Sequence, residues 1–131
     1  MNRENIIDAV ITQRGTLVEM KQTAVYGMAC YMDGQLQSTE ADEKAYHEGL
    51  VGMALLSVTS TASHPLNVLI LGGGEGATAR EVLRSRAVHH VDMVDWDEEV
   101  VRLFQKSYPQ WAQGAWSDPR LHLHFEDAFS F

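Results

Sequence analysis

The sequence is poor in cysteine and in positive charge. Cys30 is the single cysteine among 131 residues. An internal disulfide is therefore excluded, and nothing points to an oxidising compartment. Ten Lys and Arg stand against eighteen Asp and Glu, a formal net charge of −8. This balance argues against nucleic acid as a partner and permits a cationic ligand, although an ordinary acidic cytosolic protein has it too.

Long apolar runs are also missing. The N-terminus is polar, and no stretch that follows it is long enough for a signal peptide or a membrane span. We therefore expect a cytoplasmic protein with no membrane partner. The length suits one domain with a modest core.

Residues 1–38 have the composition of a small β domain. Between residues 6 and 32 β-branched and aromatic residues are frequent, and Gly15, Gly27 and the pair Asp33-Gly34 interrupt them. This pattern predicts an antiparallel meander of three or four strands. Ser38 and Thr39 then precede several acidic residues, which predicts a capped helix starting near residue 40. The polar stretch 59–65 ends in a proline, so we assign 39–65 to a linking helix and linker.

Residues 66–131 alternate between strand and helix patterns. We predict strands at 66–71, 88–94 and 121–125 and helices at 77–86 and 98–108, with the first strand buried on both faces. This α/β order is the first half of a doubly wound, Rossmann-like parallel sheet of the S-adenosylmethionine methyltransferase type. Because the sequence stops soon after the third strand, we expect a fragment or a short form, and its open sheet edge favours a homo-oligomer.

A glycine-rich loop follows the first predicted strand. Glycines let the backbone turn sharply and let a ligand approach more closely than a Cβ permits. The run fits both G-x-G-x-G, typical of S-adenosylmethionine-type nucleoside sites, and G-x-G-x-x-A, an accepted dinucleotide pattern. Glu75 disfavours NAD because a carboxylate repels a pyrophosphate, although it is also an ordinary acid at a helix N-terminus. The candidate binding residues are Gly72, Gly73, Gly74, Glu75 and Gly76.

Acidic residues follow the other two predicted strands. Asp95 ends the second strand, where its carboxylate can accept both hydroxyls of a ribose. Asp97 is predicted to cap the next helix. Asp127 follows the third strand, from which an acid can reach an adenine amino group, although a strand-end cap is the alternative. Six histidines are present, but no second cluster of cysteines or acids stands at ligand spacing, so we predict no metal site.

Four blocks of sequence, 31–48, 72–83, 94–100 and 118–128, together resemble the spermidine synthase family of aminopropyltransferases. The resemblance implies transfer of an aminopropyl group from decarboxylated S-adenosylmethionine, as co-substrate and without a prosthetic group, to a polyamine acceptor. Glu75 and Ala77 replace the common Asp and Gly, as in the thermospermine or agmatine-using branch, so the acceptor stays open.

The resemblance also implies roles for individual residues. Tyr46 should contact the amine, and His47 the nucleoside donor. Glu75 should hold the ammonium group of the donor and Asp95 its ribose. The remaining two residues, Asp127 and Ala128, should contact the adenine.

The catalytic base of the family lies in an Asp-x-x-Asp-Pro segment that would fall beyond Phe131, and Asp118-Pro119 matches a different segment. We therefore predict no catalytic residue in this chain and little transferase activity from it alone. The alternative is a non-catalytic oligomerisation or interaction module derived from the same fold. A methyltransferase is disfavoured because such folds do not usually carry this N-terminal β domain.

Overall fold

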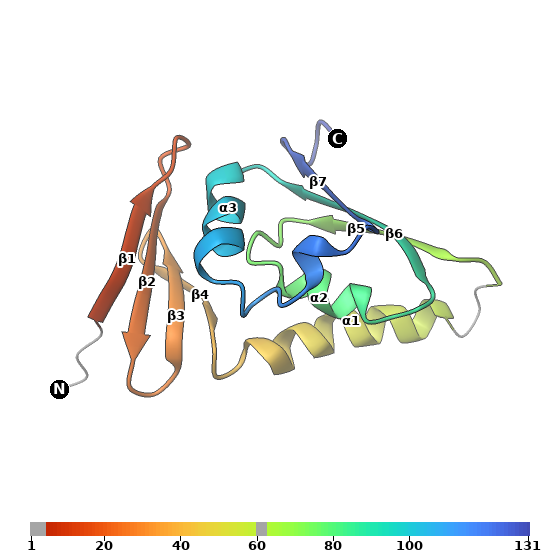
Figure 1. The fold of residues 1–131 in the computed structure, drawn as a ribbon, viewed down its shortest axis with the longest axis horizontal. Helices are drawn as coiled ribbons and strands as arrows, with labels where there is room; N and C mark the ends of the chain where they lie inside the picture. Colours follow the sequence, from red (N-terminus) through yellow and green to blue (C-terminus); the bar gives the residue numbers. More distant parts are fainter. Residues whose placement is uncertain (1–4, 60–62) are drawn as a thin grey trace. The chain divides into compact units, whose positions relative to one another are not determined.

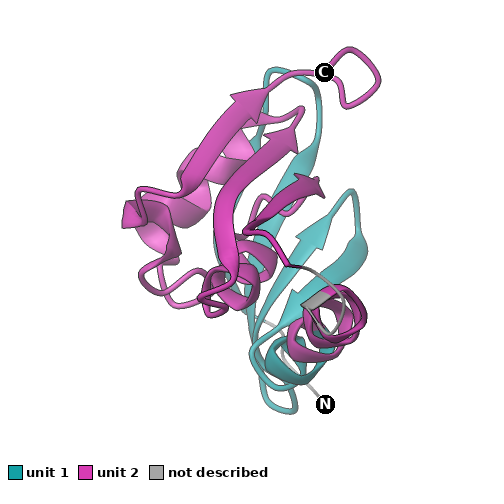
Figure 2. Cartoon of the chain, turned by 90° about the vertical axis from the view of Figure 1, so that its right-hand side faces the viewer, with its two compact units in different colours: residues 1–46 teal, residues 47–131 magenta. Residues whose placement is uncertain are grey.

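The computed structural model describes residues 5–59 and 63–131. The chain divides into two compact units, residues 1–46 and 47–131 (Figure 2). The division falls inside helix α1 (Glu43–Thr59). The three ranges assigned from composition, 1–38, 39–65 and 66–131, stay a prediction. Within the predicted linker after α1, residues 60–62 lie outside the described residues.

The first unit contains a four-stranded antiparallel sheet with the strand order β1-β2-β3-β4, so the predicted meander is confirmed (Figure 1). Asp33 and Gly34 both have positive φ, 50° and 77°, in the turn between the last two strands. Such turns match the right-handed twist of a hairpin. The strands are β1 (Asn5–Ile11), β2 (Leu17–Thr23), β3 (Gly27–Met32) and β4 (Gln35–Thr39).

Helix α1 begins later than the sequence predicts. The prediction places its start near residue 40 with a hydroxyl cap, but the helix begins at Glu43. Ser38 and Thr39, the residues expected to form the cap, belong to β4, where Thr39 pairs with Ala29 of β3. The amide of Tyr46 donates to the carbonyl of Asp42 at 3.1 Å, which makes Asp42 the first residue to accept a helical hydrogen bond.

The second unit contains a parallel sheet with the order β5-β6-β7, as predicted for the first half of a Rossmann-like fold (Figure 1). Helix α2 ends three residues before its predicted end. The amide of Ser85 donates to the carbonyl of Val82, and the amide of Val88 to the carbonyl of Ser85, so a turn replaces the last predicted helical residues. The elements are β5 (Leu66–Leu71), α2 (Ala77–Leu83), β6 (Val88–Asp95), α3 (Glu98–Ser107), the 3-10 helix η1 (Ala115–Ser117) and β7 (Leu121–Phe125).

The core of this unit lies on one face of the sheet. Ile70 and Met93 from the strands pack in one cluster with Val51 of α1, Val82 of α2 and Val101 of α3. Because side chains alternate along a strand, neighbouring positions point to the other face. There Leu69 and Leu71 are 52% and 61% exposed. The prediction that β5 is buried on both faces is therefore wrong for these described residues.

Within residues 5–59 and 63–131, no helix is both long enough and apolar enough to cross a bilayer.

Three histidines and an aspartate form a cluster across β6 and β7. Asp92 binds Nε2 of His124 through Oδ1 at 2.7 Å and Nε2 of His90 through Oδ2 at 3.0 Å. The His122 ring stacks on His90 with 4.3 Å between centroids. The His124 hydrogen bond, followed by that of His90, outweighs burial and lowers the pKa of Asp92.

We predict that Asp92→Asn lowers the free energy of unfolding by about 1 kcal/mol at neutral pH. The folded-state pKa lies below the unfolded one, so the ionised carboxylate stabilises the fold above about pH 4, and this stabilisation is lost as the pH falls through the folded-state pKa. Urea denaturation of both proteins from pH 7 to pH 3 measures the difference. A difference that does not shrink in acid would contradict the prediction.

Candidate functional site

The glycine loop joins β5 to α2 with a backbone that favours glycine. Gly72, Gly73 and Gly76 have φ values of 83°, 84° and 83°, in the left-handed region. The amide of Gly72 donates to the carbonyl of Val94 at 2.7 Å, which ties the loop to the neighbouring strand. The loop therefore sits at the carboxyl ends of β5 and β6, where open α/β sheets bind ligands.

Two of the glycines are also required by their surroundings. A Cβ on Gly74 would lie 2.9 Å from Oδ2 of Asp95. A Cβ on Gly76 would lie 2.5 Å from Cβ of Ala112 and 2.5 Å from Cζ2 of Trp116. Real Cβ atoms do not approach other atoms this closely, so glycine lets the loop pack against both Asp95 and the 112–116 segment.

Asp95 ends β6 directly beside this loop. Its Oδ1 accepts a hydrogen bond from the amide of Asp97 at 3.0 Å, which orients the carboxylate. Burial raises the pKa of Asp95, and the charges of Asp97 and Glu75 raise it further, against hydrogen bonds from the backbone of Asp97 and Gly74. The result is an oriented acceptor group, partly withdrawn from water, next to the glycine loop.

Asp97 occupies the N-cap of α3, as predicted from the sequence. Glu98 and Glu99 follow in the first turn of that helix. Acidic side chains at this end are favoured by the helix dipole. Asp97 therefore belongs to the helix start, and Asp95 is the carboxylate of this strand end that faces the loop.

His47 and Glu75 lie in contact. Nε2 of His47, on α1, is 3.2 Å from Oε1 of Glu75, in the glycine loop. His47 is 4% exposed, so the pair is largely shielded from water. The sequence predicts separate donor contacts for these two residues; the structure adds that they bind each other.

The other predicted site residues are placed differently. Tyr46 belongs to the first unit and is exposed. Asp127 lies two residues beyond β7 and is exposed, and its Oδ1 accepts from the amide of Phe129 at 2.8 Å. Ala128 is half-buried in the same turn. In this structure the Asp127 carboxylate thus closes a local turn, and its role toward an adenine stays a prediction.

Sequence reasoning missed Ala112 and Trp116, whose side chains pack against Gly76 of the loop. Trp116 is partly buried, and its Nε1 is buried without a hydrogen-bond partner among the described residues, a costly arrangement. The available signal was the spacing of small residues around an aromatic one, in the order Ala112, Gly114, Ala115 and Trp116. No local pattern shows that this segment returns to the glycine loop.

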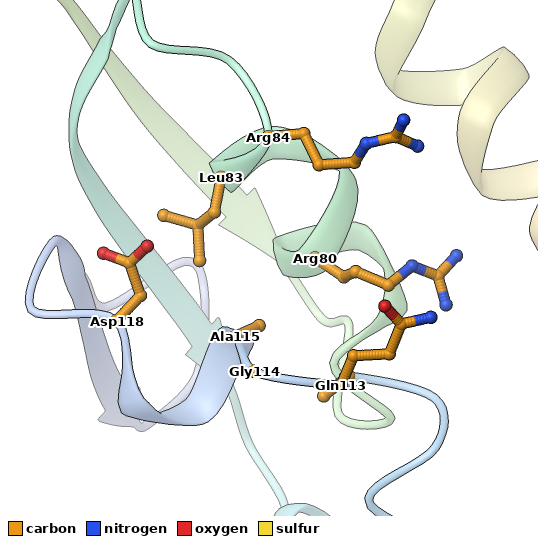
Figure 3. Close-up of a pocket in the computed structure, with 8 residues that line it drawn as sticks. Arg80, Leu83, Arg84, Gln113, Gly114, Ala115 and Asp118 are labelled. Carbon is orange, nitrogen blue, oxygen red and sulfur yellow. The ribbon is translucent and has the colours of Figure 1, made fainter.

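A shallow hollow of about 210 Å³ lies nearby but is a different feature (Figure 3). Arg80 and Gln113 line one side of it and Asp118 another, with Leu83 between them. Nη1 of Arg80 donates to the carbonyl of Trp111 at 2.6 Å, and its Nε donates to Glu81 at 3.0 Å. These bonds give Arg80 a structural role, and the lining includes no residue of the glycine loop.

The parallel sheet, the glycine loop and Asp95 define the class of protein: a Rossmann-like α/β protein whose candidate site lies at the carboxyl ends of its strands. Residues 43–131 match the family described as the Spermine/spermidine synthase domain. This match covers more than half of the chain, and the chain therefore belongs to the spermine/spermidine synthase family.

Individual relatives agree with this assignment. A polyamine aminopropyltransferase of Synechococcus sp. (strain JA-3-3Ab) is 49% identical over 84% of this chain and 35% of its own length. One of Sulfurisphaera tokodaii is 45% identical over 91% of this chain and 37% of its own length. The chain thus spans little more than a third of the length of these relatives.

Solved structures show the same fold. The crystal structure of spermidine synthase from Thermotoga maritima matches with a TM-score of 0.83 at 28% identity, over 94% of this chain and 41% of that one. A spermidine synthase in complex with the transition-state analogue AdoDATO matches equally well. The predicted resemblance and fold class are both confirmed.

Proposed function

We propose that this chain carries the donor-binding part of a polyamine aminopropyltransferase. Its ligands would be decarboxylated S-adenosylmethionine, as co-substrate, and the product methylthioadenosine. The observation that carries the proposal is the contact of Asp95 with a glycine loop that also holds an acidic residue. Glycine at position 74 leaves room for the Asp95 carboxylate, and Glu75 adds a second negative charge nearby.

This pair of carboxylates suits a cationic nucleoside better than a dinucleotide. A pyrophosphate bound at the loop would be repelled by Glu75, whereas a sulfonium or ammonium group would be attracted. Asp95 would accept the ribose hydroxyls, and the glycines would let the nucleoside approach the backbone. Asp127 and Ala128 would contact the adenine, and Tyr46 the polyamine acceptor.

The proposed reaction is an attack by a neutral amine on the carbon next to a sulfonium group, in which the bond from that carbon to sulfur breaks and methylthioadenosine leaves. It needs orientation of both partners and removal of a proton from the amine. We propose that these 131 residues supply donor binding but no base, so they bind the donor without catalysing transfer by themselves. An assay with decarboxylated S-adenosylmethionine and putrescine, agmatine or spermidine tests this; product formation would contradict it.

Calorimetric titration with methylthioadenosine, with NAD as the control ligand, tests the proposed function. We expect saturable binding of methylthioadenosine and none of NAD. Absence of methylthioadenosine binding would overturn the proposal.

We predict that Asp95→Asn weakens methylthioadenosine binding between about tenfold and a hundredfold, because a charged acceptor of two hydroxyl groups is lost. Asp92→Asn is the matched control: it removes an aspartate from the same strand at a position bound to histidines, and affinity should stay within about twofold. Equal losses in both variants would contradict the assignment of Asp95.

The same substitution should not destabilise the fold. Burial raises the pKa of Asp95, so its ionisation costs free energy in the folded state that it does not cost in the unfolded chain. This cost begins as the pH rises through the unfolded pKa and is complete above the folded one. At neutral pH we therefore expect Asp95→Asn to unfold at an equal or higher urea concentration than the wild type.

The second candidate function is a non-catalytic interaction module. The observation that favours it is the edge strand β1, on which Ile6, Ile7 and Ile11 are each at least half exposed. An exposed apolar edge favours pairing with another chain, so a homo-oligomer is proposed. A monomeric mass by light scattering at micromolar concentration would overturn this part.

A further inference from the structure

We infer that His47 is a positioning residue: it holds the Glu75 carboxylate in place and thereby makes the site prefer a nucleoside with a cationic side chain over a neutral one. This inference rests on the proposed function and deepens it. The family resemblance implies a donor contact for His47, and the structure adds that its Nε2 lies 3.2 Å from Oε1 of Glu75.

The geometry of the pair supports a positioning role. The His47 side chain is 5% exposed and that of Glu75 17%, and they approach within 3.2 Å. His47 comes from α1 and Glu75 from the glycine loop, so the contact links a regular helix to an irregular segment. Ordering a glutamate side chain costs up to about 2 kcal/mol of conformational entropy. A partner that holds it beforehand removes that cost from ligand binding.

The contact leaves the carboxylate able to bind a cation. The His47 contact is with Oε1, and an ionised carboxylate offers about four acceptor positions on its two oxygens. The charge of Glu75 also reaches Asp95, whose pKa it raises. Two carboxylates thus act on the same region, and a bound cation would relieve their repulsion.

Histidine is chemically suited to this task. A neutral imidazole donates one N–H to a carboxylate without adding a positive charge. Lysine or arginine at this position would neutralise Glu75 permanently and compete with a cationic ligand. An imidazole in its neutral form leaves the negative charge of the carboxylate uncompensated.

The test compares two ligands that differ in charge: decarboxylated S-adenosylmethionine, with a sulfonium and an ammonium group, and neutral methylthioadenosine. Calorimetry gives both affinities for the wild type, Glu75→Gln, His47→Phe and His47→Gln. His47→Phe keeps a ring but has no N–H, whereas the amide of His47→Gln retains a neutral donor. We expect Glu75→Gln and His47→Phe to lose about tenfold in affinity for the cationic ligand and less than twofold for the neutral one. His47→Gln should restore most of the preference.

Other outcomes would overturn the inference. Equal losses for both ligands in His47→Phe would assign His47 a purely structural role, and an unchanged preference would show that Glu75 needs no partner. If His47→Phe does not fold, His47→Asn replaces it, because its amide is one methylene shorter than that of glutamine. A wild type that binds neither ligand would overturn the proposed function and this inference with it. A wild type that binds methylthioadenosine while His47 variants keep the cation preference would overturn the inference alone.

Discussion

Replacing Gly76 with alanine is expected to destabilise the 47–131 unit by about 4 kcal/mol, enough to leave it largely unfolded if its stability is modest. Two costs combine. The residue has φ +83°, where an alanine is strained by about 1–2 kcal/mol. The new Cβ would also lie 2.5 Å from atoms of both Ala112 and Trp116, and overpacking of this kind costs about 1–3 kcal/mol.

Gly72→Ala separates these two costs. Gly72 has the same φ of +83°, but nothing lies within 4 Å of a Cβ built there. Only the backbone strain applies, so we expect a loss of about 1–2 kcal/mol. Urea denaturation followed by circular dichroism measures both variants. If both lose the same stability, the packing of Gly76 against the 112–116 segment contributes nothing and the prediction is wrong.

Replacing Arg120 with methionine is expected to cost about 3 kcal/mol. The Arg120 guanidinium donates to three backbone carbonyls: Leu83 at 2.6 Å, Val88 at 3.0 Å and Ser85 at 3.1 Å. It also makes a two-pronged ion pair with Asp118, through Nε at 3.0 Å and Nη2 at 2.8 Å. The side chain thus joins the end of α2, the start of β6 and the start of β7. Its loss leaves several partly buried acceptors without a donor.

Arg102→Met is the matched control for this prediction. Arg102 pairs with Glu98 on the surface of α3, where both side chains are more than half exposed. Exposed pairs of this kind contribute little, so the expected loss is below about 0.5 kcal/mol. Denaturant midpoints of the two variants provide the measurement. Similar midpoints would show that Arg120 acts only as another surface charge.

The pH dependence of the Arg120 effect adds a further check. The Asp118 pKa is lowered by the hydrogen bond from Arg120, against burial. The stabilisation from the pair is therefore present above the unfolded pKa of an aspartate, about 3.9, and decreases as the pH falls through the folded-state value. The bonds from Arg120 to the carbonyls do not titrate, so part of its contribution should persist in acid.

The site shows how binding and stability can oppose each other. Asp95 is held where its ionisation is costly, yet the proposed ligand needs that carboxylate. Gly74 and Gly76 are conformationally free in the unfolded chain and lose that freedom on folding. Both features weaken the fold locally.

Most elements of the fold follow from local patterns. The run Leu66–Leu71 and the strand Leu121–Phe125 have the predicted bounds, and the β meander forms as expected. The predictions that were wrong concern the start of α1, the end of α2 and the second face of β5. Helix α1 starts at Glu43 because β4 pairs through Thr39, and α2 stops at Leu83 because a turn begins there. The α1 boundary depends on the pairing of β4 with β3 and the α2 boundary on a local turn, and composition reports neither.

The candidate site was predictable to a similar extent. The glycine loop and Asp95 follow from the order strand, glycines, helix, strand, acid, because parallel strands bring their carboxyl ends to one edge. The contact between His47 and Glu75 was not predictable, since 28 positions separate the two residues and no pattern links them. The same is true of Trp116 and Gly76, which meet only because the segment after α3 returns to the loop.

The sequence by itself determined the element types, the position of the glycine loop, the acid at the end of β6 and the family. Each of these depends on residue type and spacing along the chain, which act over a few residues. Only the tertiary structure decided which side chains meet: His47 with Glu75, Trp116 with Gly76, and Arg120 with three carbonyls. Such contacts depend on packing between distant segments, where shape and burial select one arrangement among many that the same local patterns allow.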